Sequence, residues 1–430
     1  MHDYNLYGHA PRMVWQPGSA DELAALLRQA TADGVAVVPW GAGTQQHLGR
    51  PPARYDAALC LKHLNRIVEY TPADLVLTVE AGAQLGVVQA ELARHGQWLP
   101  WDPPGAATAT IGGLLATAAA GPLRLGYGAP RDWTLGLQVA LGDGRLVTSG
   151  ARVVKNVAGY DAHKLHLGAL GTLGVIVTAS FKLAPLPAFR RTLLVAFTEP
   201  RATINAMEGI CTAPLNPISL VALNSTAGRL LPPLGRFLTG QPERLLLIAA
   251  RFAGTPDGVQ RQIREATQHC IDAGATCIEL DEADDTPLWQ AIADFARGGP
   301  LNDAAVTGES LLLRMGIRPA HNVELLRALE RTTNQRGWEA ARLAYARIGL
   351  VYARWWLPPG TPSGALVAAL NELRQALGPF GGYVMVEDAP AALRPALDIW
   401  GPPPPTLELM RSLKAQWDPA GILNAGRYLL

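Results

Sequence analysis

The first part of the chain alternates between helical and strand-like patterns of hydrophobic positions. Leucines at helical spacing follow Ser19 and Glu22, which form a capping box able to satisfy free N–H groups at a helix start. Gly34 is placed to end this helix, and the apolar run 35–39 predicts a strand directly after it. The pattern therefore predicts a helix, a strand and then a turn.

Further elements are predicted in the same part of the chain. Residues 75–79 predict a strand, and apolar residues at helical spacing predict a helix over 85–92 that Gly96 ends. Residues 138–149 predict a hairpin that turns at a Gly-Asp-Gly sequence, and residues 175–183 predict a strand.

The hydrophobic pattern changes after Pro185 and Pro187, which mark the expected domain boundary. Beyond them strand-like and helical runs alternate, which predicts a second α/β unit about the size of one ordinary domain. The expected strands are 191–198, 217–223, 244–252, 275–280, 310–317 and 347–357, and the expected helices are 201–212, 257–272, 285–296, 322–335 and 363–377. Gly401 and the four prolines after it form a stiff linker before a last helix that carries apolar positions from 407 to 417.

Residues 105–122 are apolar over a length that suggests a membrane span. Ala, Gly and Thr dominate this stretch and prolines flank it on both sides, so we predict tightly packed backbone instead of a lipid-facing helix. The first 19 residues show no charged region followed by an apolar region, and no secretory signal is predicted.

Composition narrows the class of protein. The 430 residues favour two or three domains, and 49% hydrophobic residues are ample for packed cores. A net charge of +1 gives no electrostatic footprint for nucleic acid or for an acidic membrane surface. The 4 cysteines are scattered and form no C-x-x-C, so neither an iron–sulfur cluster nor a zinc ribbon is encoded.

The turn within residues 38–49, VPWGAGTQQHLG, is the first candidate for chemistry. Its small residues let the backbone approach a ligand, and successive exposed N–H groups can hold an anion. Gln46 stands where a dinucleotide fingerprint needs its third glycine, and no lysine follows Gly43 as a Walker loop requires. The turn alone fits either a phosphate cradle or an ordinary tight turn.

Three distant groups of small residues share the character of this turn. They are residues 100–104 with 109–113, residues 127–132, and residues 153–161 with 168–176. In this order and spacing, the four segments resemble the FAD-binding domain of the vanillyl-alcohol oxidase/PCMH superfamily over about residues 10–187. The set is far more specific than any one of its members.

Within that superfamily the chain resembles the FAD-binding E subunits of bacterial glycolate oxidases. The resemblance rests on AGP at 120–122, VVKNVAGYD at 153–161 and DPAGILNAGR at 418–427, where Ala425 replaces the usual proline of the family. It implies an α+β fold with a two-lobed FAD domain, an α/β cap and a C-terminal helix that returns to the FAD domain. The implied boundaries are 1–187, 188–400 and 401–430.

The resemblance also implies where the cofactor binds. Residues 41–45 would surround the FAD diphosphate with backbone N–H groups, 110–113 would close its other side, and 171–176 would run beside the adenosine. Asn424 and Arg427 would reach the same site from the C-terminus. The implied cofactor-binding residues are Pro39, Gly41, Ala42, Gly43, Thr44, Gln45, Pro104, Thr110, Ile111, Gly112, Gly113, Arg131, Asp132, Gly171, Thr172, Gly174, Val175, Ile176, Asn424 and Arg427.

The bond between FAD and the protein is expected to be non-covalent. His47 lies near a position at which some members of the superfamily bind the flavin covalently. The E-subunit relatives do not, and a solvated loop histidine is the alternative role of His47.

Oxidation of a 2-hydroxy acid further requires a cation for the carboxylate and a base near the hydroxyl. In the catalytic relatives of this family, a histidine-rich metal motif in the C-terminal half helps to supply the base. Here His321 is the only histidine after residue 300, and residues 381–387 contain none. His163 and His166 stand at i and i+3 without a third ligand nearby, so no metal site is predicted.

The sequence leaves the catalytic residues unassigned. Arg314, Arg347 and Arg354 lie on expected strands of the second unit and could face a substrate or form surface contacts and ion pairs. Lys155 lies near the flavin motifs and could be functional or a surface lysine at a strand end.

Three functions are compatible with these features. The chain is expected to be the electron-carrying FAD subunit of a complex that oxidises glycolate to glyoxylate, with a paralogous catalytic FAD subunit and an iron–sulfur subunit as partners. The alternatives are a self-sufficient D-lactate-type dehydrogenase and a non-catalytic FAD-containing scaffold. We expect a cytoplasmic protein without a membrane span of its own, and any attachment to the inner membrane through its partners.

Overall fold

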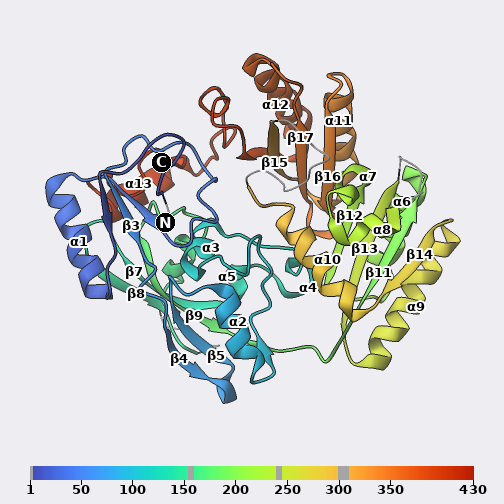
Figure 1. The fold of residues 1–430 in the computed structure, drawn as a ribbon, viewed down its shortest axis with the longest axis horizontal. Helices are drawn as coiled ribbons and strands as arrows, with labels where there is room; N and C mark the ends of the chain where they lie inside the picture. Colours follow the sequence, from blue (N-terminus) through green and yellow to red (C-terminus); the bar gives the residue numbers. More distant parts are fainter. Residues whose placement is uncertain (1–2, 154–158, 239–244, 299–308) are drawn as a thin grey trace. The chain divides into compact units, whose positions relative to one another are not determined.

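The computed structural model describes residues 3–153, 159–238, 245–298 and 309–430, shown as a coloured ribbon in Figure 1. The chain forms two compact units, which are described separately. Unit 1 comprises residues 1–120, 128–186 and 402–430, and unit 2 comprises residues 121–127 and 187–401. Both units combine helices with sheets, and the predicted α+β fold is confirmed.

The described residues of unit 1 form three sheets. A parallel sheet has the order β1–β3–β2, an antiparallel sheet has the order β4–β5–β9–β7–β8, and β6 pairs with β10. The strands are β1 (Met13–Trp15), β2 (Val37–Trp40), β3 (Ala57–Cys60), β4 (Ile67–Thr71), β5 (Val76–Glu80), β6 (Gln97–Trp98), β7 (Thr134–Ala140), β8 (Leu146–Gly150), β9 (Val175–Lys182) and β10 (Ala184–Pro185). The predicted strands in this region and the hairpin, formed by β7 and β8, are therefore present.

The helices of unit 1 are α1 (Ala20–Asp33), α2 (Leu85–Ala93), α3 (Ile111–Thr117), α5 (Pro130–Trp133) and α13 (Leu407–Trp417). The Ser19 hydroxyl accepts a hydrogen bond from the Glu22 amide at 3.1 Å, and Gly34 ends α1 with a φ of +67°. The Glu22 carboxylate accepts from the Gly18 amide at 2.7 Å, one residue earlier than a standard capping box places this bond.

The apolar stretch 105–122 contains α3, which has 7 residues. A Cβ on Gly112 would lie 2.8 Å from the Cβ of Ala81, so the helix packs against its neighbour with no room for a side chain. Within the described ranges, no helix is long and apolar enough to cross a membrane.

Unit 2 is built on one antiparallel sheet of 8 strands with the order β14–β11–β13–β12–β16–β17–β15–β18. Its strands are β11 (Phe189–Phe197), β12 (Ser219–Asn224), β13 (Leu246–Gly254), β14 (Thr276–Leu280), β15 (Ser310–Gly316), β16 (Glu339–Tyr345), β17 (Leu350–Trp356) and β18 (Tyr383–Asp388). Its helices are α4 (Arg124–Tyr127), α6 (Pro200–Thr212), α7 (Ser225–Arg229), α8 (Gly235–Leu238), α9 (Pro256–Asp272), α10 (Glu282–Asp294), α11 (Asn322–Asn334) and α12 (Ser363–Leu377). The sequence pattern did not predict β16 or β18.

The C-terminal segment, residues 418–427, joins the parallel sheet of unit 1. The Val37 amide donates to the Ile422 carbonyl at 2.8 Å, and the Asn424 amide donates to the Val37 carbonyl at 2.9 Å. Leu423 thereby forms a parallel bridge to β2, which leads directly into the turn at residues 41–45. These pairings bring the last residues of the chain beside the first glycine-rich turn.

Candidate functional site

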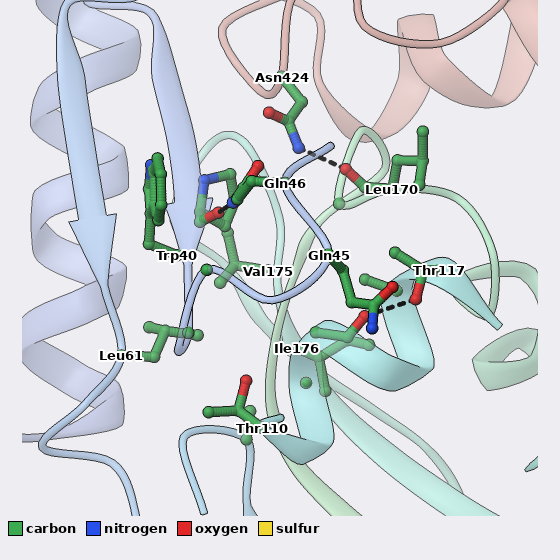
Figure 2. A pocket seen from close by; sticks show the side chains of 18 of the residues that line it. Trp40, Gln45, Gln46, Leu61, Thr110, Thr117, Leu170, Val175, Ile176 and Asn424 are labelled. Carbon is green, nitrogen blue, oxygen red and sulfur yellow. Dashed lines mark hydrogen bonds between the residues drawn. The ribbon is translucent and has the colours of Figure 1, made fainter. Parts of the chain in front are cut away.

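A pocket in unit 1 is formed where four separate segments meet (Figure 2). The segments are the turn after β2, helix α3 with the residue before it, the loop that leads into β9 with the start of that strand, and the C-terminal segment, while Leu61 and Ala81 add single positions. The lining residues are Pro39, Trp40, Gly41, Ala42, Gly43, Thr44, Gln45, Gln46, Leu48, Leu61, Ala81, Thr110, Gly112, Gly113, Ala116, Thr117, Leu170, Gly171, Gly174, Val175, Ile176, Asn424 and Arg427.

Fifteen of the residues expected from sequence to bind the cofactor line this pocket. They are Pro39, Gly41, Ala42, Gly43, Thr44, Gln45, Thr110, Gly112, Gly113, Gly171, Gly174, Val175, Ile176, Asn424 and Arg427. Members of the first turn, the α3 region, the loop before β9 and the C-terminal segment are therefore brought together by the fold.

The five other expected residues lie outside the lining. Pro104 accepts a hydrogen bond from the Gln45 side chain through its carbonyl at 3.3 Å, so it supports the lining from behind. Ile111 belongs to the hydrophobic core, and the Thr172 hydroxyl is bonded to the Ala169 carbonyl at 2.6 Å. Arg131 is exposed, and the Asp132 carboxylate accepts from the Ala129 amide at 2.8 Å at the start of α5.

Eight lining residues were not expected from the sequence: Trp40, Gln46, Leu48, Leu61, Ala81, Ala116, Thr117 and Leu170. Three of them lie within the glycine-rich turn region, so the turn itself was the available signal. Leu61 and Ala81 follow strands β3 and β5 directly, and apolar residues at strand ends carry no motif that identifies them.

The turn after β2 presents a row of backbone donors. Within the described part of the chain, the five amides of residues 41–45 make no hydrogen bond to protein atoms. The amides of Gly113, Gly171 and Gly174 are likewise without a protein acceptor there. Oriented N–H groups of this kind form a concave site for an anion without the need for a lysine.

Glycine is required at two positions of the turn. A Cβ on Gly41 would lie 2.0 Å from the Thr110 hydroxyl, so the bare backbone of the turn packs directly against the Thr110 side chain at the start of α3. Gly43 has a φ of +74°, and a Cβ there would lie 3.0 Å from the Trp40 ring. A side chain at Gly41 would therefore collide with Thr110, and one at Gly43 would be strained by its left-handed backbone.

Arg427 fixes the end of the turn. It is 4% exposed, and its guanidinium donates to the Gln46 side-chain oxygen, to the Gln46 carbonyl at 2.7 Å and to the Leu48 carbonyl at 2.7 Å. The Gln46 amide group in turn donates to the Pro39 carbonyl at 2.8 Å. A chain of hydrogen bonds thus runs from the C-terminus to the end of β2.

Asn424 joins the C-terminal segment to the loop before β9. Its side-chain nitrogen donates to the Leu170 carbonyl, and the two residues face each other in Figure 2. Both adopt left-handed backbone, with φ of +47° at Asn424 and +52° at Leu170. The buried side-chain oxygen of Asn424 has no partner among the described residues, which leaves it available to a donor group of a ligand.

Two histidines of unit 1 are buried, and His166 lies next to the lining residue Gly174. His166 is 5% exposed and stacks on Trp417, with ring centroids 4.9 Å apart. Burial lowers the pKa of His166 to about 4, and the positive charge of His163 acts in the same direction. The pKa of His163 is also lowered, again chiefly by burial. The residues that the structure describes include no group of three or more His, Cys, Asp or Glu placed to hold a metal ion.

Two further residues were singled out in the sequence, His47 and Lys155. The His47 carbonyl accepts a hydrogen bond from the Tyr7 hydroxyl at 2.5 Å, and His47 is not a lining residue. Lys155 lies outside the described residues.

The three arginines of unit 2 have different surroundings. Arg314 forms an ion pair with the buried Glu387 at 2.8 Å, and burial raises the pKa of that carboxyl. Arg354 is 1% exposed and donates to the Ser310 hydroxyl at 3.0 Å and the Arg297 carbonyl at 2.9 Å. Arg347 is exposed in a 3₁₀ helix (Ala346–Ile348) before β17, whereas the sequence pattern had placed it on the strand.

Comparison with known proteins identifies the class of ligand. Residues 11–150 match the family described as FAD binding domain, and residues 402–428 match the family described as FAD linked oxidases, C-terminal domain. These matches and the relatives below confirm the predicted FAD cofactor and the predicted class of FAD-dependent oxidoreductase.

Three relatives differ in how much of their length aligns with this chain. The chain is 33% identical to glycolate oxidase subunit GlcD of Bacillus subtilis over 219 residues, 51% of this chain and 46% of the relative. It is 38% identical to glycolate oxidase subunit GlcE of Escherichia coli over 162 residues, 37% of this chain and 46% of the relative. It is 27% identical to D-2-hydroxyglutarate dehydrogenase of Xanthomonas citri pv. viticola over 433 residues, 97% of this chain and 89% of the relative. The chain thus aligns with about half of each glycolate oxidase subunit.

The solved structure of p-cresol methylhydroxylase with bound substrate has the same fold. The two structures superpose with a TM-score of 0.74 at 15% sequence identity, covering 97% of this chain and 89% of that chain. At this identity the likeness supports the fold alone.

Proposed function

We propose that this chain is the FAD-binding subunit of a multi-subunit glycolate oxidase or dehydrogenase, in which it carries electrons released by oxidation of a 2-hydroxy acid. The observation that supports this most is a pocket of unpaired backbone amides in a chain whose residues 381–387 contain no histidine. FAD, when bound, supplies two-electron redox chemistry that protein side chains lack.

The pocket residues fit the parts of FAD. We assign the amides of residues 41–45, and that of Gly113 at the start of α3, to the diphosphate. Asn424 offers a buried acceptor oxygen, and Arg427 holds the turn in place through Gln46. We assign these residues to binding and orienting the cofactor. We assign no proton transfer to any of them.

The charged residues of unit 2 favour dependence on a partner. A substrate carboxylate needs an available cation, and the Arg314 guanidinium already pairs with Glu387. Arg354 is committed to two neutral oxygens in the interior. Neither Arg314 nor Arg354 is therefore available to hold the carboxylate of a 2-hydroxy acid, and we infer that a partner supplies the substrate site.

The proposed partners are a paralogous catalytic FAD subunit and an iron–sulfur subunit. Similarity to both a GlcD and a GlcE subunit supports a place in such an assembly. The 4 cysteines form no C-x-x-C, which is consistent with clusters carried by another chain. A cytoplasmic location, with any attachment to the inner membrane through these partners, stays a prediction.

A dye-reduction assay tests the proposal. The chain is purified alone, its FAD is quantified, and turnover is followed with glycolate, D-lactate and D-2-hydroxyglutarate, before and after the partner subunits are added. We expect bound FAD and turnover only in the assembled complex. On a denaturing gel the flavin fluorescence is expected to leave the chain, and fluorescence that stays with it would show a covalent bond.

A second candidate is a self-sufficient D-2-hydroxy acid dehydrogenase of the D-lactate type. The alignment with D-2-hydroxyglutarate dehydrogenase favours it, because it spans 97% of this chain at 27% identity. Robust turnover by the isolated chain would establish this alternative. A third possibility, a scaffold whose FAD does not react, predicts full activity of the complex after FAD is removed from this chain alone.

A further inference from the structure

The side chain of Lys414 connects three segments of unit 1. Lys414 lies on α13, and its ammonium donates to the Thr172 carbonyl at 2.8 Å and to the Leu423 carbonyl at 3.0 Å. It also donates to the carboxylate of Asp418, one helical turn further along the chain. One amino group thus joins the loop before β9 to the C-terminal segment.

Asp418 completes this arrangement as a buried acceptor. It is 2% exposed, and its two oxygens accept from the amides of Ile422 at 3.1 Å and Leu423 at 2.9 Å. A Cβ on Gly142 would lie 2.6 Å from the same carboxylate, so the neighbouring turn packs closely over it. Burial lowers the pKa of Lys414, and the negative charge of Asp418 opposes that shift. The pair is therefore held by several hydrogen bonds, as a buried ion pair requires.

The two carbonyls that Lys414 binds belong to two neighbouring segments, each of which forms one wall of the cofactor pocket. Thr172 is flanked by Gly171 and Gly174, which line the pocket, and Leu423 directly precedes Asn424, which also lines it. Lys414 itself is not a lining residue. Its contacts are to the backbone of each wall, so they fix where the lining groups stand without occupying the pocket.

We propose that Lys414 is a positioning residue for the cofactor, which clamps the loop before β9 to the C-terminal segment so that the groups of both walls converge on FAD. This inference rests on the proposed FAD site. The two walls are also joined by the bond from Asn424 to Leu170, which lies at the pocket surface. Lys414 is the link behind the surface, and its loss removes one of these two connections while the Asn424–Leu170 bond remains.

The test compares FAD release from holoprotein carrying Lys414→Met or Lys414→Arg. Lys414→Met keeps the apolar stem and removes the donors, and we expect FAD to dissociate at least about tenfold faster, since a charged hydrogen-bond donor is lost. Lys414→Arg keeps the positive charge, and we expect it to release FAD more slowly than Lys414→Met but faster than the wild-type chain. Arg411→Met on the same helix is the matched control, because Arg411 is exposed and pairs only with nearby Glu408 at 2.7 Å, and it should release FAD at the wild-type rate.

A purely structural role makes a different prediction. Thermal unfolding is measured for the apo and FAD-loaded forms, and a positioning role requires the increase in Tm caused by FAD to shrink in Lys414→Met. An equal loss of Tm in both forms, with an unchanged rate of FAD release, would overturn the inference. If Lys414→Met does not fold, Lys414→Gln and Lys414→Arg are measured in its place. Failure of the wild-type chain to bind FAD would instead reject the proposed function and leave the clamp as a structural feature.

Discussion

The guanidinium of Arg427 donates to both the side-chain oxygen and the carbonyl of Gln46, which lies 381 positions earlier in the chain. Gln46 then donates to the Pro39 carbonyl at 2.8 Å. The C-terminal segment thus holds the glycine-rich turn at residues 41–45. The pocket is completed only when both ends of the chain have folded together.

Replacing Arg427 by lysine is expected to weaken FAD binding about tenfold, because lysine keeps the charge but loses the planar fork that reaches several oxygens at once. The dissociation constant is measured by titration of the apoprotein with FAD. Arg411→Lys, an exposed position on α13, is the control and should leave the dissociation constant unchanged. Equal FAD affinity of Arg427→Lys and the wild-type chain would contradict the role given to this side chain.

Gly41→Ala tests the contact between the turn and α3. The new methyl group would stand 2.0 Å from the Thr110 hydroxyl and 3.0 Å from its Cβ, so the turn must move away. We expect overpacking to cost about 1–3 kcal/mol and the purified variant to carry less FAD, measured by absorbance of the released flavin. Gly364→Ala, in α12 with no atom within 4 Å of the added Cβ, is the control. Full FAD content in Gly41→Ala would show that the turn has room that the structure does not indicate.

The local pattern of the sequence predicted elements whose signals lie within a few residues. The capping of α1 by Ser19, the glycine that ends it, and the last helix are examples. The strands β16 and β18 were missed for different reasons. The Glu339–Tyr345 segment is rich in alanine, which carries little strand preference, and the strand Tyr383–Asp388 has no clean alternation of polar and apolar residues. β18 pairs with the distant strand β15, whereas β16 pairs with the next strand, β17, and with the distant strand β12, so tertiary pairing determines β18 and contributes to β16.

In the candidate site, too, features with a local sequence signal could be predicted, whereas features that depend on tertiary packing could not. Glycine-rich segments could be identified from sequence because backbone contact restricts the residues that fit. Within these segments, however, the sequence did not separate lining residues from supporting ones. Thr172 lies between two pocket glycines, yet its hydroxyl bonds to Ala169 and its carbonyl to Lys414. Leu61 and Ala81 reach the pocket only through the packing of separate strands, and no local signal marks such a position.

Asp285→Asn is expected to destabilise unit 2. The Asp285 carboxylate is 0% exposed and accepts from Arg251 and from the Thr192 hydroxyl at 2.6 Å. Loss of its charge leaves the buried Arg251 uncompensated, and breaking such a pair costs about 3–5 kcal/mol. Urea unfolding monitored by tryptophan fluorescence measures the change, since Trp289 donates to Thr192 within the same network. Glu282→Gln, an exposed position on the same helix, should unfold like the wild-type chain, and equal stability of both variants would refute the prediction.

Acidification is expected to destabilise unit 1 through His166. Its pKa falls from 6.5 in the unfolded chain to about 4 in the folded protein because burial disfavours the charged ring. The unfolded state therefore binds more protons between these values, and stability that is complete above pH 6.5 declines as the pH falls toward about 4. The shift corresponds to a loss on the order of 3 kcal/mol at most. Denaturant unfolding at several pH values measures it.

His166→Phe isolates this contribution, because phenylalanine can stack on Trp417 and does not titrate. The variant should lose less stability than the wild-type chain between pH 6.5 and 4, and the difference between their unfolding free energies should narrow or change sign on acidification. The pKa of His163 is also lowered, so protonation of His163 destabilises the folded protein in the same direction on acidification. The His166→Phe variant is therefore expected to keep a weaker dependence of stability on pH. His63→Gln, at an exposed position, controls for substitution of a histidine. Parallel pH profiles for His166→Phe and the wild-type chain would show that the His166 ring is not the group that titrates in this range.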